Sequence, residues 1–512
     1  MGVARTLAVA LQGLRGALVD VEASITSGLP KFTLIGLPDA SLSEAAHRVL
    51  AAASNSGASL AQSRVIANLS PATLPKHGSA FDLAIALAAM AAAGSISSAS
   101  IAGTVHLGEL GLDGRVRPVL GVLPAVHAAV RAGARRVMVP LGNLAEAQLV
   151  PDVEVIPVAS LRDAAIRHGG DFTPIPVEPV LAAPVSPRAI DDLDLSEVIG
   201  NDDAVRALVV AAAGGHHAYF LGPPGAGKTM LAERMPGLLP DLDERAALEA
   251  TSIRSLTELG SVSELVTRPP FEAPHHTASA AALVGGGSTR IRPGAAVRAS
   301  HGVLFLDEAP EFQPAALDAL RQPLESGVIT ISRAHHQAEF PARFQLVLAA
   351  NPCPCGLYGV SADKECTCGP GRRRAYLNRL SGPLMDRIDL QLTVNRLAPA
   401  QLLAAGDRPR RTSAEARHQV ELARAAARER FAGAGWEING RIPSKWLTEG
   451  PGRLPKRITS SLDRHYQRHA MTMRGYVRVL RVAWTLADLD GAVSPGAEHV
   501  GAAIALREGD SA

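Results

Sequence analysis

The sequence lacks any apolar run long enough to cross a membrane. The longest such run, from Leu83 to Gly94, is mostly alanine and falls short of the ~20 residues that a bilayer requires. The first residues show neither a continuous hydrophobic segment nor the small-residue cleavage site of a secretory signal. We therefore expect a cytoplasmic protein with no membrane partner.

Net charge is also nearly absent. The chain has 51 basic and 49 acidic residues, which leaves a formal charge of +2. No global field attracts nucleic acid, so any contact with DNA must come from local clusters of basic side chains. Lysine itself is scarce: the chain has six, and one of them lies in the glycine-rich motif at its centre.

A chain of 512 residues is too long for a single hydrophobic core. The segment 172–187 contains five prolines, which exclude a regular helix or strand and predict an extended linker. Strand-like runs alternate with alanine-rich helices before the linker, and helical periodicity prevails near the C-terminus. We therefore expect an α/β domain at 1–171, a second α/β domain with a parallel sheet at 188–396, and a helical lid domain at 397–512.

The centre of the chain carries a phosphate-binding loop. A short apolar run ends at Leu221, a glycine-rich turn follows, and a good helix former begins at Met230. In this context backbone N–H groups close around phosphates, Lys228 reaches the β- and γ-oxygens, and the Thr229 hydroxyl binds Mg²⁺. The pattern predicts that ATP and Mg²⁺ bind through Gly222, Pro223, Pro224, Gly225, Ala226, Gly227, Lys228 and Thr229.

A second apolar run, 302–306, ends in two carboxylates. Asp307 at the strand end would hold Mg²⁺ through water, and Glu308 would orient and deprotonate the attacking water. The alternative is a strand with two solvated acids at its end. The phosphate-binding loop upstream favours the catalytic interpretation.

Two more polar residues follow in an order that suits ATP hydrolysis. Asn351 ends a third apolar run, where its side chain would touch the γ-phosphate and the attacking water. Arg387 would serve as an arginine finger that reaches the ATP of a neighbouring subunit and stabilises the charge of the transition state. A lone arginine of this kind otherwise forms a surface ion pair.

All four cysteines lie within sixteen residues, as the pairs Cys353-Pro-Cys355 and Cys366-Thr-Cys368. Four thiolates suit tetrahedral Zn²⁺, and a cytoplasmic location argues against disulfides. Cys-x-Cys is less usual than Cys-x₂-Cys in zinc sites, so reduced thiols in a loop are the alternative. The basic run 372–374 that follows is either a local DNA contact or a solvated face.

The order of these motifs resembles the AAA+ superfamily and, more narrowly, its magnesium-chelatase-like branch. The resemblance is carried by Ala211-Ala-Ala-Gly-Gly-His-His217, Ala273-Pro-His-His-Thr277, Leu283-Val-Gly-Gly-Gly287, Pro293-Gly294 and Leu304-Phe-Leu-Asp-Glu-Ala-Pro-Glu-Phe312. With Ile35-Gly-Leu-Pro-Asp39 and Asn68-Leu-Ser-Pro-Ala72, it extends nearly end to end and narrows to the ComM/YifB-type subfamily.

This resemblance implies a homo-oligomeric, hexameric ring that hydrolyses ATP and moves branched or single-stranded DNA, as a branch-migration helicase in recombination or natural transformation (competence). It makes Arg474 the sensor-2 arginine, for which a surface charge is the alternative. It also implies that the segment 275–298 and a β-hairpin at 328–340 line the central pore. Arg333, His335 and His336 of the hairpin would then meet the phosphate backbone, unless the turn is simply a solvated loop.

The N-terminal domain resembles the Lon-type protease domain, which has the ribosomal S5 domain 2-like fold. The matching residues are Gly78-Ser-Ala80, Gly108-Glu-Leu-Gly-Leu-Asp-Gly-Arg-Val116 and Gly133-Ala-Arg-Arg-Val-Met-Val-Pro140. Ser79 would occupy the nucleophile position, but Val122-Leu-Pro-Ala125 stands where the catalytic lysine belongs. A serine without a base is a weak nucleophile, so we expect a structural or nucleic-acid-binding module and no protease.

Two other functions fit the same motifs. The chain could be an ATPase subunit of a metal chelatase, although chelatase motor subunits resemble the AAA+ part alone. It could also be a nucleotide-dependent chaperone or remodeler of a protein client, which predicts ATP binding without stimulation by DNA.

Overall fold

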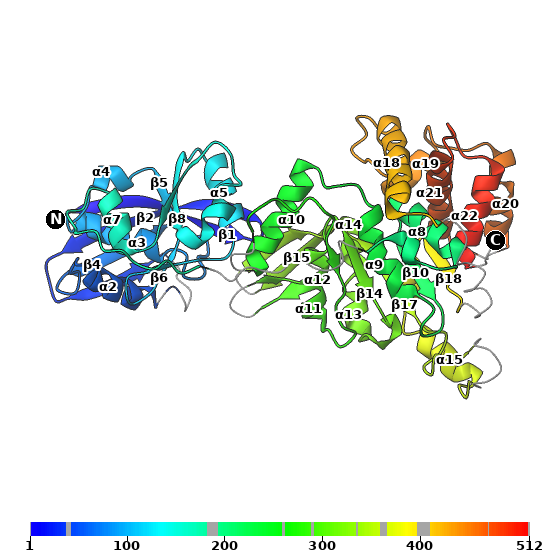
Figure 1. The fold of residues 1–512 in the computed structure, drawn as a ribbon, viewed down its shortest axis with the longest axis horizontal. Helices are drawn as coiled ribbons and strands as arrows, with labels where there is room; N and C mark the ends of the chain where they lie inside the picture. The colour runs from blue at the N-terminus through cyan, green and yellow to red at the C-terminus, as the bar shows by residue number, and fades with distance from the viewer. Residues whose placement is uncertain are drawn as a thin grey trace.

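The computed structural model describes residues 2–36, 42, 44–181, 193–258, 262–287, 291–333, 336–358, 366–396, 410–468 and 471–509. These residues form an elongated molecule with an N-terminal α/β domain at one end, a sheet-centred domain in the middle and a group of helices at the other end (Figure 1). Residues 172–181 form no helix or strand, and the remainder of the predicted linker lies outside the described residues.

The N-terminal domain is built on a seven-stranded sheet of order β3-β4-β2-β1-β5-β8-β9. Its central strands pair antiparallel and its flanking strands pair parallel. The strands are β1 (Val3–Gln12), β2 (Arg15–Thr26), β3 (Lys31–Ile35), β4 (Arg64–Ser70), β5 (Thr104–His106), β8 (Arg136–Pro140) and β9 (Glu154–Val158). The helices of eight or more residues are α2 (Ala45–Asn55), α3 (Asp82–Ala92) and α5 (Val122–Arg131).

Helix α3 contains most of the longest apolar run of the sequence. All eleven of its residues are buried, and the helix packs against β1 and β2. A helix that is apolar all round needs cover on every side, and the domain core supplies it. Within the part of the chain that the structure describes, no helix is long and apolar enough to cross a membrane.

The middle domain has a five-stranded sheet of order β11-β14-β17-β10-β18, in which every pair is parallel. The expected α/β fold with a parallel sheet is confirmed to this extent. The strands are β10 (Ala218–Leu221), β11 (Phe271–Glu272), β14 (Val303–Leu306), β17 (Gln345–Ala350) and β18 (Leu390–Thr393). Side chains alternate along β17, so that Val347 and Ala349 join one hydrophobic cluster while Leu346 and Leu348 join another.

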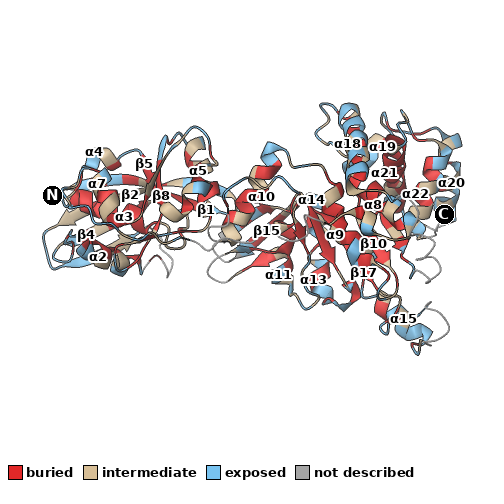
Figure 2. Ribbon diagram, in the orientation of Figure 1, coloured by how far each residue is buried: buried red, intermediate tan, exposed pale blue. Residues whose placement is uncertain are grey.

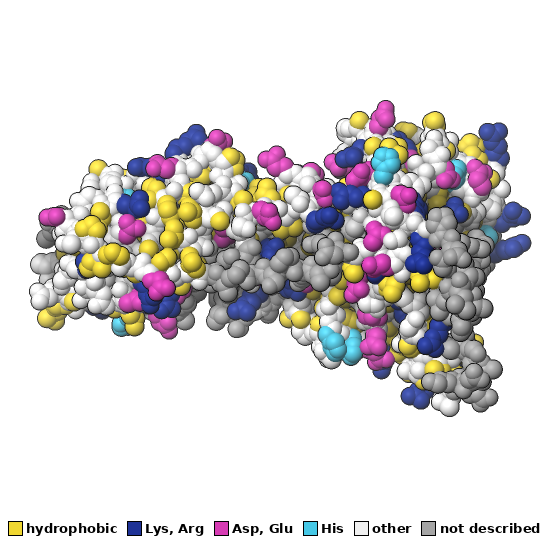
Figure 3. Space-filling model, viewed as in Figure 1, with side chains coloured by type: hydrophobic (Ala, Val, Ile, Leu, Met, Phe, Trp, Pro, Cys, Tyr) yellow, Lys and Arg dark blue, Asp and Glu magenta, His cyan; other side chains and the backbone are white. Residues whose placement is uncertain are grey.

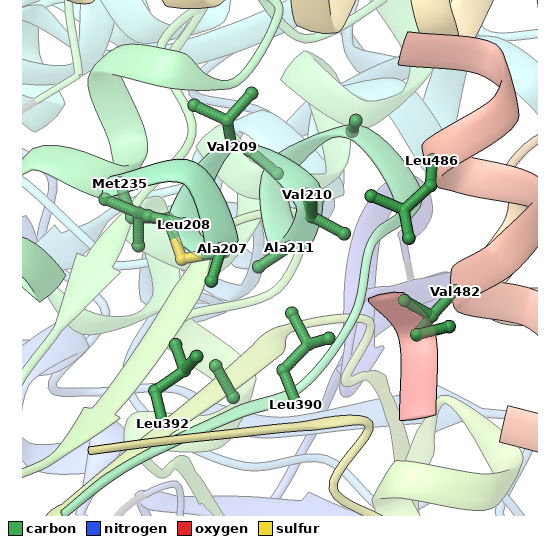
Figure 4. Packing of buried hydrophobic residues seen from close by; sticks show 14 of the residues in the cluster. Ala207, Leu208, Val209, Val210, Ala211, Met235, Leu390, Leu392, Val482 and Leu486 are labelled. Carbon is green, nitrogen blue, oxygen red and sulfur yellow. The ribbon is translucent and has the colours of Figure 1, made fainter. Parts of the chain in front are cut away.

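The first of these clusters joins the sheet to the C-terminal helices. Helix α8 (Asp202–Gly214) packs between β18 and α21 (Met473–Leu489), and Figure 4 shows Val210 facing Leu390 and Leu486. Buried residues run through all three parts of the molecule (Figure 2). The remaining long helices are α9 (Lys228–Leu238), α10 (Glu244–Thr257), α15 (Pro370–Leu377), α18 (Ser413–Arg430), α20 (Lys456–Gln467) and α22 (Ala497–Glu508).

The predicted hairpin is present as β15 (Val328–Arg333) and β16 (His336–Pro341), with six residue pairs in antiparallel register. The turn that carries His335 and the side chains of Arg333 and His336 lie outside the described residues. Their predicted contact with DNA therefore stays a prediction.

The N-terminal domain docks directly on the middle domain. Ser255 of α10 accepts a hydrogen bond from the Gly121 backbone N–H at 3.0 Å, and its hydroxyl donates to the buried carboxylate of Glu146. At the β1–β2 turn, a Cβ added to Gly13 would lie 2.5 Å from the Glu339 carbonyl oxygen of β16. The β1–β2 turn therefore lies directly against the base of the hairpin.

Helix α18 begins with a capping box formed by Thr412 and Glu415. The Glu415 N–H donates to the Thr412 hydroxyl at 3.2 Å, and the Thr412 N–H donates to the Glu415 carboxylate at 2.9 Å. Each side chain thereby satisfies a backbone donor that the helix leaves unpaired.

Replacing Thr412 by alanine should weaken the first turn of α18 by about 1 kcal/mol, because one capped N–H loses its partner. Hydrogen exchange of the amides at the start of the helix measures the effect as faster opening. The matched variant Thr412→Ser keeps the hydroxyl and should exchange at the original rate. Equal loss of protection in both variants would show that the cap does not hold this turn.

Candidate active site

Three strands end together at the candidate nucleotide site. β10 leads into the phosphate-binding loop, β14 into Asp307 and β17 into Asn351. Because β14, β17 and β10 are parallel neighbours in the sheet, their carboxyl ends lie side by side. The sheet thus brings together residues that the sequence separates by more than a hundred positions.

The glycines of the loop adopt conformations that other residues avoid. Gly225 and Gly227 have φ values of +76° and +94°. A Cβ added to Gly222 would lie 2.1 Å from the carbonyl oxygen of Val394, so this position accepts no side chain. Gly227 precedes α9 and supplies no capping side chain, which leaves the first N–H groups of the helix able to bind an anion.

Lys228 points back across the loop toward Asn351. Its Nζ donates to the carbonyl oxygens of Gly222 at 2.6 Å and Pro223 at 2.9 Å, and to Asn351 Oδ1 at 3.1 Å. Burial lowers the pKa of Lys228, and the nearby carboxylates of Asp307 and Glu308 oppose that shift. The ammonium group therefore lies between the loop and the strand ends, where the sequence analysis expects phosphate oxygens.

The two expected Mg²⁺ ligands touch each other. The Thr229 hydroxyl donates to Asp307 Oδ2 at 2.7 Å. A hydroxyl and a carboxylate oxygen are ligands that suit Mg²⁺, which keeps several waters and binds through few protein groups. The residues present therefore fit a magnesium ion bridging the loop and the end of β14.

Glu308 is held in an unusual backbone conformation. Its φ of +50° lies in the left-handed region, and its N–H donates to Asp307 Oδ1 at 2.8 Å. Such strain recurs at active sites, where it aims a side chain. The Glu308 carboxylate is 48% exposed and lies 3.1 Å from Nδ1 of His276.

The contact of His276 with Glu308 is not predicted by the sequence, in which this histidine is one residue of the motif 273–277. The histidine follows β11, which pairs with β14, so the sheet places it beside the end of the neighbouring strand. Its ring also lies 4.1 Å from that of His275. The sequence does show a polar residue soon after a strand. It does not show that β11 lies beside β14, so the partner of this histidine could not be predicted.

Arg387 and Arg474 do not lie at this end of the sheet. Both line a cavity of about 1000 Å³ at the amino ends of the strands, where His217, Gly302 and Gln345 also line it. Neither the phosphate-binding loop nor Asp307, Glu308 or Asn351 is among the described residues that line it. The four residues of β10 alone span ~13 Å between the two ends.

The cavity is strongly basic. Five acidic residues line it, including the buried Asp389, and they are outnumbered by nine arginines: Arg245, Arg343, Arg387, Arg424, Arg428, Arg441, Arg474, Arg478 and Arg481. Burial by itself would raise the pKa of Asp389, but Arg478 at 2.6 Å and the neighbouring histidines hold it well below its ordinary value. The excess of arginine suits an anionic partner such as a phosphate group.

The two predicted arginines differ in their surroundings. Arg387 is 7% exposed, donates to the Glu325 carboxylate and the Pro383 carbonyl, and has a buried Nε without a hydrogen-bond partner in the described structure. Arg474 is exposed on α21, and no ion pair is found for it among the described side chains. Both can therefore interact with a group from outside this chain.

The four cysteines come together as the sequence predicts. Sγ of Cys353 lies 3.3 Å from that of Cys355 and 3.6 Å from that of Cys366, and the Cys355 and Cys366 sulfurs are 3.5 Å apart. The four sulfurs, including that of Cys368, all lie within 4.8 Å of one another, and none of them forms a disulfide. Sulfurs bound to one tetrahedral zinc at 2.3 Å are ~3.8 Å apart, so the cluster fits this ion.

Ser79 of the N-terminal domain has no lysine partner in the described structure. Its hydroxyl donates to the Glu109 carboxylate. The residues 122–125, which stand where the Lon pattern has its lysine, are buried in α5. The nearby Lys76 is fully buried and donates to the carbonyl oxygens of Gly36, Leu69 and Pro71, which occupies all three of its protons. The lack of proteolysis therefore stays a prediction from the sequence.

If Thr229 and Asp307 share a magnesium ion, Thr229→Val should reduce the gain in nucleotide affinity that Mg²⁺ provides by ten- to a hundredfold, as is typical of losses at metal sites. Titration of fluorescent ADP with and without Mg²⁺ measures this gain. Thr229→Ser keeps the hydroxyl and serves as the control. A full Mg²⁺ effect in the valine variant would exclude Thr229 as a ligand.

Comparison with known proteins places this site in a family. Residues 194–402 match the family model described as magnesium chelatase, subunit ChlI; residues 410–507 match the model of its C-terminal part; and residues 21–143 match the model of subunit ChlI of Mg-chelatase. An uncharacterised protein of Mycobacterium tuberculosis is 46% identical, with 99% of each chain covered.

Two further relatives are informative. The competence protein ComM of Haemophilus influenzae is 41% identical, over 99% of this chain and 98% of its own. Lon protease 2 of Bacillus subtilis is 27% identical over a third of the length, 34% of each chain. The family uses ATP and Mg²⁺, which is what the site geometry accommodates. The chain belongs to the ComM/YifB-type subfamily of the magnesium-chelatase-like AAA+ ATPases.

Proposed function

We propose that the protein is a hexameric ring motor that hydrolyses ATP to move DNA, most specifically a branch-migration helicase acting in recombination or natural transformation. The observation that carries the proposal is the division of the ATPase machinery between opposite ends of one sheet. The loop, Asp307, Glu308 and Asn351 lie at one end, and Arg387 and Arg474 at the other. Head-to-tail packing of identical chains would bring the two halves together, and such packing closes into rings.

In the proposed reaction each group has one task. Lys228 and the loop N–H groups would bind the phosphates, while Thr229 and Asp307 would hold Mg²⁺, which would neutralise charge that develops on the phosphate oxygens. Glu308 accepts the proton of the attacking water, and Asn351 orients that water. Opening of the contact between Glu308 and His276 would free the carboxylate for this task.

Arg387 and Arg474 would reach the ATP of the next subunit. For Arg387 this requires the exchange of Glu325 for a phosphate oxygen, which Glu325 permits because it is 55% exposed and is readily solvated once released. Arg474 is already exposed. Two guanidinium groups on one phosphate would stabilise the transition state only when the ring interface is closed.

The choice of DNA as substrate is supported by the name of the full-length relative, a competence protein. We place the hairpin β15–β16 at the pore, where Arg333, His335 and His336 would meet the phosphate backbone. Charges of both signs are mixed over the face in Figure 3, so local contacts of this kind have to carry DNA binding. The proposed location is the cytoplasm, where such a substrate is found.

We further assign the N-terminal domain a Lon-like fold without proteolysis, and Zn²⁺ as the ion held by Cys353, Cys355, Cys366 and Cys368. The Lon relative and the matching glycine motifs support the first assignment. The distances between the four sulfurs support the second.

A chelatase-type or chaperone-type ATPase acting on a protein client is the second candidate. The descriptions of the matching family models favour it, and one of them covers residues 21–143. The N-terminal domain therefore does not separate the two candidates, contrary to the argument from sequence. Stimulation of ATP hydrolysis by DNA separates the two candidates.

ATP hydrolysis should rise several-fold when a four-way DNA junction is added, because a motor consumes ATP while it moves its substrate. Glu308→Gln removes the base and should lower hydrolysis by 10²–10⁴-fold, the usual contribution of such a group. Phosphate release with and without the junction is the measurement. If hydrolysis depends on Glu308 but is not stimulated by any DNA, the protein is an ATPase but not a DNA motor.

Completion of the site by a neighbour can be tested by mixing inactive variants. Lys228→Ala and Arg387→Ala should each hydrolyse little ATP alone, but a 1:1 mixture should regain roughly a quarter of the normal rate, because that fraction of ring interfaces pairs an intact loop with an intact arginine.

The matched control is a mixture of Arg387→Ala with Arg474→Ala. Both variants damage the same side of the interface, so no interface is complete and no activity should return. Recovery in this control, or none in the first mixture, would contradict the proposed division of the site.

A further inference from the structure

The cysteine cluster lies against the phosphate-binding loop. The turn that begins at Cys353 is closed by a hydrogen bond from the Gly356 N–H to the Cys353 carbonyl at 2.9 Å. Gly356 has a φ of +73°, and a Cβ added to it would lie 2.6 Å from Cγ and 2.7 Å from Cδ of Pro224. The backbone of the cysteine turn therefore packs directly on the loop that is expected to bind ATP.

The same turn is joined to Asn351. Only one residue separates Asn351 from Cys353, and Asn351 Oδ1 accepts the hydrogen bond of Lys228 at 3.1 Å. A shift of the cysteine turn would therefore move two things at once: the surface that supports Pro224 and the side chain that holds the ammonium group.

The second cysteine pair connects to the site by another route. Cys366 and Cys368 lead into α15, which projects from the body of the molecule in Figure 1. Tyr376 of α15 is nearly buried and receives a hydrogen bond from the Asn351 backbone. Burial raises the pKa of Tyr376 to about 12, and the carboxylates of Glu311 and Glu308 raise it further.

The exposure of the four cysteines suits the entry of a metal ion. Cys353 and Cys368 are buried, Cys366 is half-buried, and Cys355 is exposed, so an ion can enter from solvent. Within the described residues no disulfide joins the two pairs. Zn²⁺ would displace the four thiol protons and tie the end of β17 to the start of α15.

We propose that a zinc ion held by the four cysteines is a structural support of the ATP site, so that loading with zinc sets the affinity for nucleotide. This inference rests on the proposed ATPase function of the same site. The ion fixes Gly356 against Pro224 and Asn351 beside Lys228 before nucleotide arrives. Without it these groups must be ordered during binding, which lowers affinity.

The first experiment uses the full-length wild-type chain. Elemental analysis should find one zinc per chain, and no iron. Removing the metal with a thiol-reactive mercurial and a chelator, followed by reduction, should weaken binding of fluorescent ADP about tenfold, and adding Zn²⁺ back should restore it. A chain purified without metal that takes up none, or one that binds ADP equally with and without zinc, would overturn the proposal.

Two variants separate metal binding from its effect on the loop. Cys366→Ser/Cys368→Ser should lose both zinc and about tenfold in ADP affinity. Gly356→Ala keeps every cysteine and should retain zinc, yet its methyl group meets Pro224, so its ADP affinity should also fall. Unchanged affinity in the zinc-loaded Gly356→Ala variant would contradict the coupling.

The same measurements distinguish this inference from the proposed function. If the wild-type chain contains zinc but binds no nucleotide in any state, the ATPase proposal fails and the coupling falls with it, while the metal site stands. If nucleotide binds tightly whatever the zinc content, only the coupling fails. A cysteine variant that does not fold leaves the removal and return of zinc in the wild-type chain as the deciding test.

Discussion

The parallel register of β14, β17 and β10 is the constraint on which the rest of the site depends. Parallel strands point their carboxyl ends the same way, so the pairing of these three strands brings the loop, the carboxylates and Asn351 together at one end of the sheet. Because the strands are parallel, the chain must return to their amino ends between one strand and the next, and the arginines lie at those amino ends. A single topological choice therefore creates an anion site at one end and a cluster of cations at the other.

The sequence predicts that the loop, Asp307 and Asn351 lie together, which the structure shows, but it does not predict that the arginines gather around one cavity. The loop is a local motif whose glycines are dictated by backbone geometry, and Asp307 and Asn351 could be placed because each ends an apolar run. The capping box at Thr412 and the clustering of the cysteines were likewise local signals. Each of these features is fixed within a few residues, so pattern and spacing suffice.

The features that escaped prediction depend on contacts between distant segments. His276 meets Glu308 only because β11 lies beside β14, and Arg474 joins Arg387 only because α21 packs on α8. The contact of Gly356 with Pro224 has the same character. Helical periodicity near the C-terminus predicts helices but not the elements that they cover, since many partners bury an apolar face equally well.

Gly121 and Gly13 of the N-terminal domain contact the middle domain directly, so the proline-rich connection is not the only link between the two domains. The Ser255 carbonyl oxygen accepts a hydrogen bond from Gly121, and the Glu339 backbone lies directly against Gly13. The relative position of the two domains therefore does not depend on the connection alone. A side chain at Gly13 would meet the Glu339 carbonyl oxygen, and one at Gly121 would meet Leu11 and Leu256, one from each domain, so either substitution would push the two domains apart.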